Sequence, residues 1–276
     1  MGLFTPTLRT HAQEMAEPYN YPEHRDIVLP LIKERYRWLP NNYSLAMVNA
    51  LYGTPFVTTI EYYYPELGAT AGNITDQYLW GGDVMVAPVL EKGATSRKVT
   101  FPGKERWYDL NNPTATYCDT TVIYPAPLSV LPHFVKEGTM IPTAEYPMTS
   151  TADYRNDTFT LNFYPVAGDS YLSVFINDDT KTPSTSDKYS VSGFTMRLST
   201  EDPENTTLAL AELYPDKESM PYHLTFRIYD IDRKPKAVRD SSGKKIKFSY
   251  DKSTRSVSFA GDYTPSKTPV VYTINR

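Results

Sequence analysis

Two side chains close to the N-terminus have the chemistry of a ligand-binding pair. Arg9 and His11 end an extended run of polar and apolar residues that begins at Leu3. A guanidinium only donates hydrogen bonds, whereas a neutral imidazole offers one donor and one acceptor. A strand that carries such a pair to an active site should lie deep inside a domain. We therefore expect this chain to begin in the middle of one.

Other residues with reactive or ligating side chains give weaker signals. Asp178 and Asp179 are adjacent carboxylates, but two acids fall short of the roughly six to eight oxygens that calcium takes. We predict a solvated turn there.

The lone Cys118 can build neither a disulfide framework nor a zinc site, and a structural thiol is the expected interpretation. The remaining histidines stand apart from one another: His24, His133 and His223. We predict no metal site and no cofactor.

Composition excludes some classes of partner. The 276 residues carry a net charge of -4 with a pI of about 5.6, and their basic residues are scattered. This gives no electrostatic case for nucleic acid or an anionic membrane. No apolar stretch approaches the ~18 residues of a membrane helix, and no leader pattern follows Met1. Localisation stays unknown, and a periplasmic or secreted protein is possible if a preceding segment carries a signal peptide.

The only long helical pattern covers residues 23–52, where apolar residues recur at spacings of three and four. Pro40 falls in the middle of it and should kink or split the helix after Leu39. The sequence Gly53-Thr54-Pro55 should end it. The β-branched run at 56–60 predicts a short strand, so this region has the order of an α/β unit.

From residue 83 onward the pattern predicts β-structure. Short strands are expected at 83–89, 98–101, 121–124 and 133–135, separated by Gly and Pro turns, and strands at such spacing suggest a β-sandwich. The polar stretch 143–157 is a candidate linker. Beyond it, alternating apolar residues predict a second, antiparallel sandwich with hairpin turns at 241–244 and 251–254. The expected inward faces are Phe159, Leu161 and Phe163; Phe194, Met196 and Leu198; Leu224, Phe226 and Ile228; Ile246, Phe248 and Tyr250; and Val270, Tyr272 and Ile274.

Eight segments of the chain, taken in order, resemble the C-terminal half of glycoside hydrolase family 31, which contains α-glucosidases, α-xylosidases and related enzymes. No single segment is decisive, but several in sequence are specific. The resemblance rests on residues 3–11, 17–19, 34–43, 76–89, 107–109, 127–142, 163–165 and 174–180. One departure is Thr180, which stands where the family usually has glycine.

The resemblance implies a mainly β fold, with two β-sandwich domains preceded by a helical, α/β remnant of the end of a (β/α)8 barrel. The expected domains are the barrel segment at 1–75, a proximal sandwich at 76–145 and a distal sandwich at 146–276.

The resemblance also implies which parts of the enzyme supply the catalytic residues and which bind the sugar. A retaining glycosidase needs two carboxyl groups about 5–5.5 Å apart. The family supplies both as aspartates upstream of the Arg-x-His strand, and no segment here matches either one, so no catalytic residue is predicted. The resemblance places His11 as a ligand to sugar hydroxyls in subsite -1, with Arg9 beside it or supporting the strand. Glu17 matches a structural loop position.

We therefore expect the C-terminal fragment of a retaining α-glycosidase, inactive alone, which contributes a wall of subsite -1 and a scaffold. Its expected partners are an α-linked oligosaccharide or glycoside and the missing N-terminal part of the barrel. The alternative is a free-standing carbohydrate-binding or structural β-sandwich module. The aromatic residues Trp38, Trp80 and Trp107 are expected in packing. Four N-glycosylation sequons matter only in a glycosylating pathway: Asn42, Asn73, Asn156 and Asn205.

Overall fold

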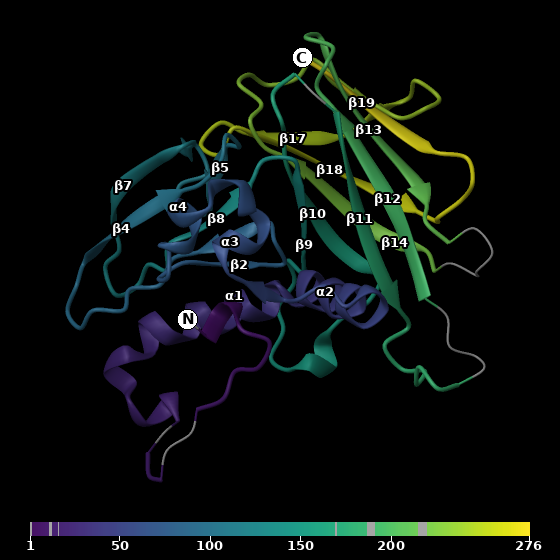
Figure 1. The fold of residues 1–276 in the computed structure, drawn as a ribbon. Coiled ribbons are helices and arrows are strands. Elements are labelled where there is room, and N and C mark those ends of the chain that lie inside the picture. The colour runs from purple at the N-terminus through teal and green to yellow at the C-terminus, as the bar shows by residue number, and fades with distance from the viewer. Residues whose placement is uncertain (1, 11–12, 16, 169, 187–190, 215–219) are drawn as a thin grey trace. The chain divides into compact units, whose positions relative to one another are not determined.

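A computed structural model describes residues 2–10, 13–15, 17–168, 170–186, 191–214 and 220–276 (Figure 1). The fold is mainly β, as predicted. The chain divides into two compact units. Unit 1 consists of Met1–Leu39 and Thr54–Lys136, and unit 2 consists of Pro40–Gly53 and Glu137–Arg276. This division does not test the expected three domains, whose boundaries stay predictions. No described helix has the length and hydropathy needed to cross a lipid bilayer.

The predicted helical region forms two helices, α1 (Arg25–Arg37) and α2 (Leu39–Tyr52). The break falls at Trp38, just ahead of the predicted position, because Pro40 occupies the first turn of α2, where its missing N–H costs nothing. Gly53 ends α2 as predicted. It adopts φ 72° and donates its N–H to the carbonyl of Asn49 at 2.8 Å.

Unit 1 is built on a six-stranded sheet with the order β1-β2-β3-β8-β5-β6 and on the separate hairpin β4-β7. The sheet strands are β1 (Val57–Thr58), β2 (Tyr78–Trp80), β3 (Val84–Val86), β5 (Trp107–Asp109), β6 (Thr116–Tyr117) and β8 (His133–Lys136). The hairpin strands are β4 (Ser96–Phe101) and β7 (Thr120–Pro125). Two short helices, α3 (Ile60–Tyr63) and α4 (Ala69–Gly72), complete the unit, with 3-10 turns at Gly2–Phe4, Pro18–Asn20, Pro22–His24 and Pro65–Leu67.

The core of unit 1 joins the sheet, the hairpin and the short helices. Its buried members are Ile60, Tyr64, Ala71, Leu79, Met85, Ala87, Val99, Phe101, Trp107, Tyr124, Ala126 and Phe134. The predicted strand at 56–60 shortens to the two residues of β1, because Ile60 already starts α3.

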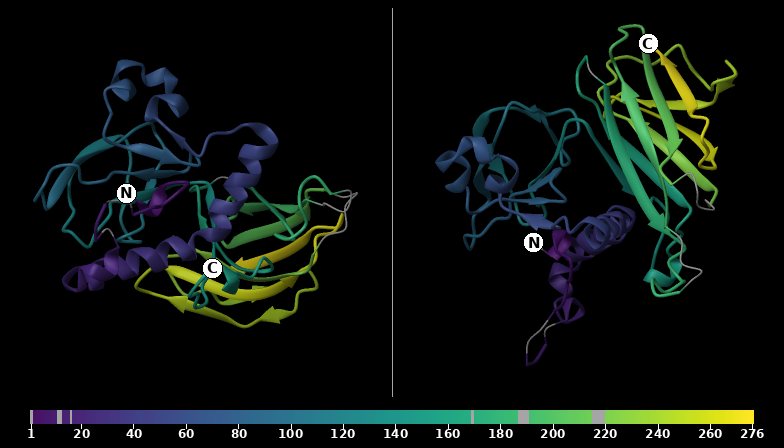
Figure 2. Two further views of the ribbon diagram at one scale, coloured as in Figure 1. Left: turned by 90° about the horizontal axis from the view of Figure 1, so that it is seen from below. Right: turned by 45° about the vertical axis from the view of Figure 1, so that its right-hand side comes forward.

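Unit 2 is a sandwich of a five-stranded sheet, β17-β18-β14-β10-β9, and a six-stranded sheet, β11-β12-β13-β19-β15-β16 (Figures 1 and 2). The strands of the first sheet are β9 (Thr139–Thr143), β10 (Thr158–Tyr164), β14 (Tyr222–Ile228), β17 (Phe248–Asp251) and β18 (Ser256–Tyr263). Those of the second are β11 (Ser170–Asp178), β12 (Val191–Ser199), β13 (Asn205–Glu212), β15 (Ala237–Arg239), β16 (Lys245–Ile246) and β19 (Val270–Asn275). A 3-10 turn, Thr151–Asp153, lies in the predicted linker.

The alternating apolar residues fill the sandwich as predicted, with Phe163, Phe194 and Phe226 fully buried. Two predictions are corrected. The pair β10–β14 is parallel, in register from Thr158↔His223 to Phe163↔Ile228. The chain runs through three strands of the other sheet between them, which supplies the long crossover that parallel pairing requires.

The second correction concerns Ile246, Phe248 and Tyr250, which were expected on one strand. The chain breaks at Lys247 into β16, which pairs with β15, and β17, which pairs with β18 in the other sheet. The strand therefore crosses the sandwich. Both predicted hairpin turns are present on either side of this crossing, at 241–244 and 251–254.

Residues of α2 that fold with unit 2 cover the edge strand β11. Ser44 accepts a hydrogen bond from the N–H of Ile176 at 3.2 Å, and the Tyr43 hydroxyl donates to Asp178 Oδ1 at 2.7 Å. A side chain that occupies an edge N–H blocks pairing with another strand. The helix thus protects this end of β11.

Candidate functional site

The segment that leads to Arg9 and His11 is not a strand in the described residues. Gly2–Phe4 forms a 3-10 turn, and the next six residues are irregular. Arg9 is exposed, and His11 lies outside the described residues, as does its predicted role. The predicted extended run is therefore wrong for residues 2–4.

Arg35 of α1 explains the shape of this segment. Its Nη1 donates to the carbonyl oxygens of Gly2, Leu3 and Thr5 at 2.8, 3.0 and 2.8 Å, and its Nη2 to that of Pro6 at 3.2 Å. Carbonyls that converge on one guanidinium cannot point alternately to two sides, as they do in a strand. Partial burial lowers the pKa of Arg35.

Phe4 anchors the same segment in an aromatic cluster of unit 1. Its ring meets Trp38 edge-on at 4.9 Å between centroids, His133 at 5.2 Å and Trp80 at 6.3 Å. Phe4, Trp38 and Trp80 are almost completely buried. The tryptophans serve packing here, as predicted.

Hydrogen bonds and an ion pair lie at the edge of this aromatic cluster. Glu34 accepts from Trp38 Nε1 at 2.7 Å and pairs with Arg37 at 2.8 Å. His133 Nδ1 lies 2.8 Å from the carbonyl oxygen of Leu131, and burial lowers the pKa of His133, which favours the neutral ring. These contacts fix Trp38 and His133, two of the rings against which Phe4 packs.

Glu17 directly precedes the 3-10 turn Pro18–Asn20. Its Oε2 accepts a hydrogen bond from the Thr10 hydroxyl at 2.8 Å. The carboxylate is exposed. This bond ties Thr10 to the turn at Pro18–Asn20.

Asp178 ends β11, and Asp179 leads into the bend that follows it. Asp179 accepts from the N–H groups of Lys181 and Thr182 and from the Thr182 hydroxyl, which lowers the pKa of Asp179 to about 2. Asp178 is buried rather than solvated, which corrects the prediction, because Tyr43 covers it. Nowhere in the described ranges do three or more His, Cys, Asp or Glu residues gather in a way that could hold a metal ion.

Thr180 has a strained backbone in this turn, with φ 58°. A β-branched residue in the left-handed region costs on the order of 1–3 kcal/mol. We expect Thr180→Gly to stabilise unit 2 by about 1 kcal/mol and to raise its Tm by about 2–4 °C in calorimetry. Thr180→Ala is the matched control, since it removes the hydroxyl but keeps Cβ. Equal melting of the two variants would show that the backbone strain is absent in solution.

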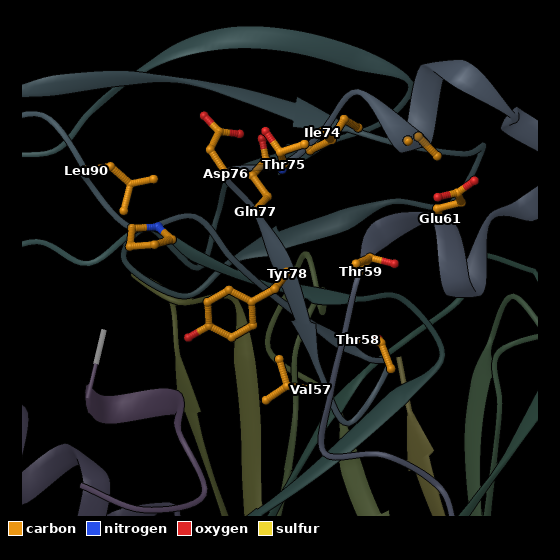
Figure 3. Close-up of a pocket in the computed structure, with 13 residues that line it drawn as sticks. Val57, Thr58, Thr59, Glu61, Ile74, Thr75, Asp76, Gln77, Tyr78 and Leu90 are labelled. Carbon is orange, nitrogen blue, oxygen red and sulfur yellow. The ribbon is translucent and has the colours of Figure 1, made fainter. Parts of the chain in front are cut away.

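Unit 1 contains a surface cavity of about 400 Å³ that the sequence did not reveal (Figure 3). Figure 3 shows Glu61 and Leu90 on opposite sides of it, with Asp76 and Gln77 between them. The lining residues are Val57, Thr58, Thr59, Glu61, Ala71, Gly72, Ile74, Thr75, Asp76, Gln77, Tyr78, Pro88 and Leu90.

Three polar residues of this cavity are engaged by the fold. Asp76 Oδ2 forms an ion pair with Arg97 at 2.7 Å. Gln77 is buried and bonds both backbone groups of Thr100, accepting from its N–H at 2.8 Å and donating to its carbonyl at 2.9 Å. The Tyr78 hydroxyl donates to the carbonyl of Phe4 at 2.8 Å. Of the two carboxylates in the lining, Glu61 and Asp76, the second is held by the ion pair with Arg97.

Comparison with known proteins decides the family. Residues 53–141 match the model described as the glycosyl hydrolase family 31 C-terminal domain. The chain belongs to glycoside hydrolase family 31. It is 31% identical over 217 residues to neutral alpha-glucosidase AB from Homo sapiens, an alignment that covers 74% of this chain and 23% of that protein.

Two further proteins are similar to this chain. An alpha-xylosidase from Saccharolobus solfataricus is 25% identical over 177 residues, 63% of this chain and 24% of the relative. A family 31 dextranase from Flavobacterium johnsoniae, solved with isomaltotriose, has a TM-score of 0.82 at 22% identity over 96% of this chain and 34% of that chain. The similarity to the dextranase structure shows that the two chains share a fold. The chain spans about a quarter of the length of these curated relatives, and it corresponds to a C-terminal portion of a family 31 protein.

Proposed function

We propose that this chain is the non-catalytic C-terminal part of a retaining α-glycosidase of the α-glucosidase or α-xylosidase type. The observation that carries the proposal is the match of residues 53–141 to the family 31 C-terminal domain. The relatives named as α-glucosidases and as an α-xylosidase support the substrate class. Structures of a family 31 dextranase with isomaltotriose and with glucose support an α-linked oligosaccharide as the ligand of the intact enzyme.

The proposed mechanism divides the work between this chain and the remainder of the barrel. One carboxylate attacks the anomeric carbon and the other carboxyl group protonates the leaving oxygen; water then releases the sugar with retained configuration. Both groups belong to the remainder of the barrel. Residues 1–276 supply a scaffold and one wall of subsite -1.

Within that wall, His11 is the proposed ligand to sugar hydroxyls, and Arg9 lies beside it. The contacts of the preceding residues support a fixed position for this segment. Arg35 binds four of its carbonyls, and Phe4 is locked among aromatic rings. Glu17 bonds Thr10, directly before His11. A segment held at three points loses little further freedom when it binds a sugar.

The first test is turnover by the purified 276-residue chain. We expect no hydrolysis of aryl α-glucosides or aryl α-xylosides above a blank, because the chain contributes neither carboxyl group. An intact family 31 enzyme, assayed in the same buffer, is the positive control. Hydrolysis that follows the purified chain through size-exclusion chromatography would refute the proposal.

The second test separates this function from that of a free-standing sugar-binding module. Maltose or xylose oligomers are titrated against the chain and against His11→Ala, with heat of binding as the readout. We expect little or no binding by either. Clear binding that survives His11→Ala would favour the module, since such a site would lie on the sandwiches.

A further inference from the structure

The four sequons of this chain differ in how much freedom the fold leaves them. N-linked glycosylation needs Asn-X-Ser/Thr, and a folded domain tolerates the bulky oligosaccharide only at its surface. The asparagine must also have a carboxamide nitrogen that the fold does not need. These two requirements can be checked for each sequon in the described residues.

Three sequons fail. The Asn42 sequon lies inside α2, and its Ser44 is buried and bonded to the N–H of Ile176. The other two failing asparagines use Nδ2 in the fold. Asn156 donates to the carbonyl of Asp178 at 3.2 Å, and Asn205 donates to Asp202 Oδ2 at 2.8 Å. A glycan on either nitrogen would replace one of its two hydrogens and place a bulky sugar beside these bonds.

Asn73 meets both requirements. It follows α4 at the start of an irregular loop that leads to β2, and both Asn73 and Thr75 are exposed. Its backbone N–H completes α4 by bonding the carbonyl of Ala69 at 3.0 Å, while within the described part of the chain no hydrogen bond engages its carboxamide. Figure 3 shows the neighbouring Ile74 and Thr75 at the rim of the cavity, which opens to solvent.

We propose that Asn73 is an N-linked glycosylation site. The donor class is an oligosaccharide joined to a polyprenyl lipid through a diphosphate. Asn73 Nδ2 forms a bond to C1 of the first sugar, and the bond between C1 and the diphosphate oxygen breaks. The lipid diphosphate leaves with the electron pair, and Nδ2 loses one proton. This site is independent of the sugar ligand proposed for His11.

The test uses the full chain, directed into the secretory pathway of a eukaryotic host by an added leader. Intact mass is measured before and after treatment with peptide-N-glycosidase F. We expect one glycan per chain, and enzymatic release should convert Asn73 to Asp, as located by peptide mapping. Asn73→Gln should abolish the modification, and the matched control Asn205→Gln should leave it in place.

A second pair of variants keeps the test decisive if Asn73→Gln folds poorly. Thr75→Ala destroys the sequon without changing the asparagine, whereas Thr75→Ser preserves it. We expect the glycan to be lost in the first and kept in the second. A secreted, folded chain that is unmodified, or one that carries its glycan at another sequon with Asn73 bare, would overturn the proposal.

Discussion

Phe4→Ala is expected to lower the free energy of unfolding of unit 1 by about 3–5 kcal/mol, the usual cost of truncating a buried phenylalanine. The ring is fully buried and contacts Trp38, Trp80 and His133. Its loss opens a cavity where the first residues of the chain meet α1 and the sheet. All three tryptophans, Trp38, Trp80 and Trp107, belong to unit 1, so tryptophan fluorescence during denaturant unfolding reports on this unit alone.

The matched control is Leu8→Ala, in the same segment. Leu8 is 48% exposed, so its truncation should change the unfolding free energy by less than about 0.5 kcal/mol. If Phe4→Ala unfolds at the same denaturant concentration as Leu8→Ala, residues 2–4 do not pack in solution as they do in the structure. The support for a fixed His11 segment would then be lost.

Much of the fold follows from local patterns in the sequence. Pro40 splits the helical region because a proline ring is tolerated only in a first turn. The alternation at Phe159, Leu161 and Phe163 places these side chains in the sandwich core because the strand period is two. These features depend on a few neighbouring residues, so they could be predicted.

The parts that were missed depend on distant residues. The first residues bend because Arg35, about thirty positions later, gathers their carbonyls. The switch of sheets at Lys247 leaves the alternation of apolar residues unchanged, because both strands face the same core. Periodicity shows which face of a strand is buried, but it does not show which sheet the strand joins.

The candidate site also has a part that local sequence could indicate and a part that depends on distant residues. Arg9 and His11 were singled out by their chemistry, and their predicted role came from a family resemblance of local segments, which does not depend on their folded positions. The cavity beside Glu61 and Asp76 gave no signal, because its lining comes from three separate stretches, 57–61, 71–78 and 88–90. No spacing rule connects these stretches, and only the fold brings them together.

Asp109 and Tyr124 form a buried pair in the core of unit 1. Asp109 belongs to the segment Trp107-Tyr108-Asp109, one of those that resemble family 31. Asp109 is 1% exposed, and the Tyr124 hydroxyl lies 3.0 and 2.9 Å from its two carboxylate oxygens. The N–H groups of Asn111 and Asn112 also donate to Oδ1, at 2.8 and 3.2 Å. Burial raises the pKa of Asp109, and the hydrogen bonds oppose that rise.

Tyr124→Phe is therefore expected to destabilise unit 1 by about 1–3 kcal/mol at neutral pH, since it removes a hydrogen bond to a buried charge. Without the hydroxyl, the pKa of Asp109 rises further. A carboxyl whose folded pKa lies above its unfolded value gains stability as the pH falls through the folded pKa, because the folded state then takes up a proton that the unfolded state does not. The cost of Tyr124→Phe should therefore be largest at pH 7.5 and should shrink toward pH 4.5.

The measurement is denaturant unfolding by tryptophan fluorescence at both pH values, for the parent chain and the variant. Tyr62→Phe is the matched control, because Tyr62 is 58% exposed in the same unit and should show little loss at either pH. A cost of Tyr124→Phe that does not change with pH would mean that the loss of the hydroxyl leaves the protonation of Asp109 unchanged throughout this range. The pH dependence inferred from the raised pKa of Asp109 would then be wrong.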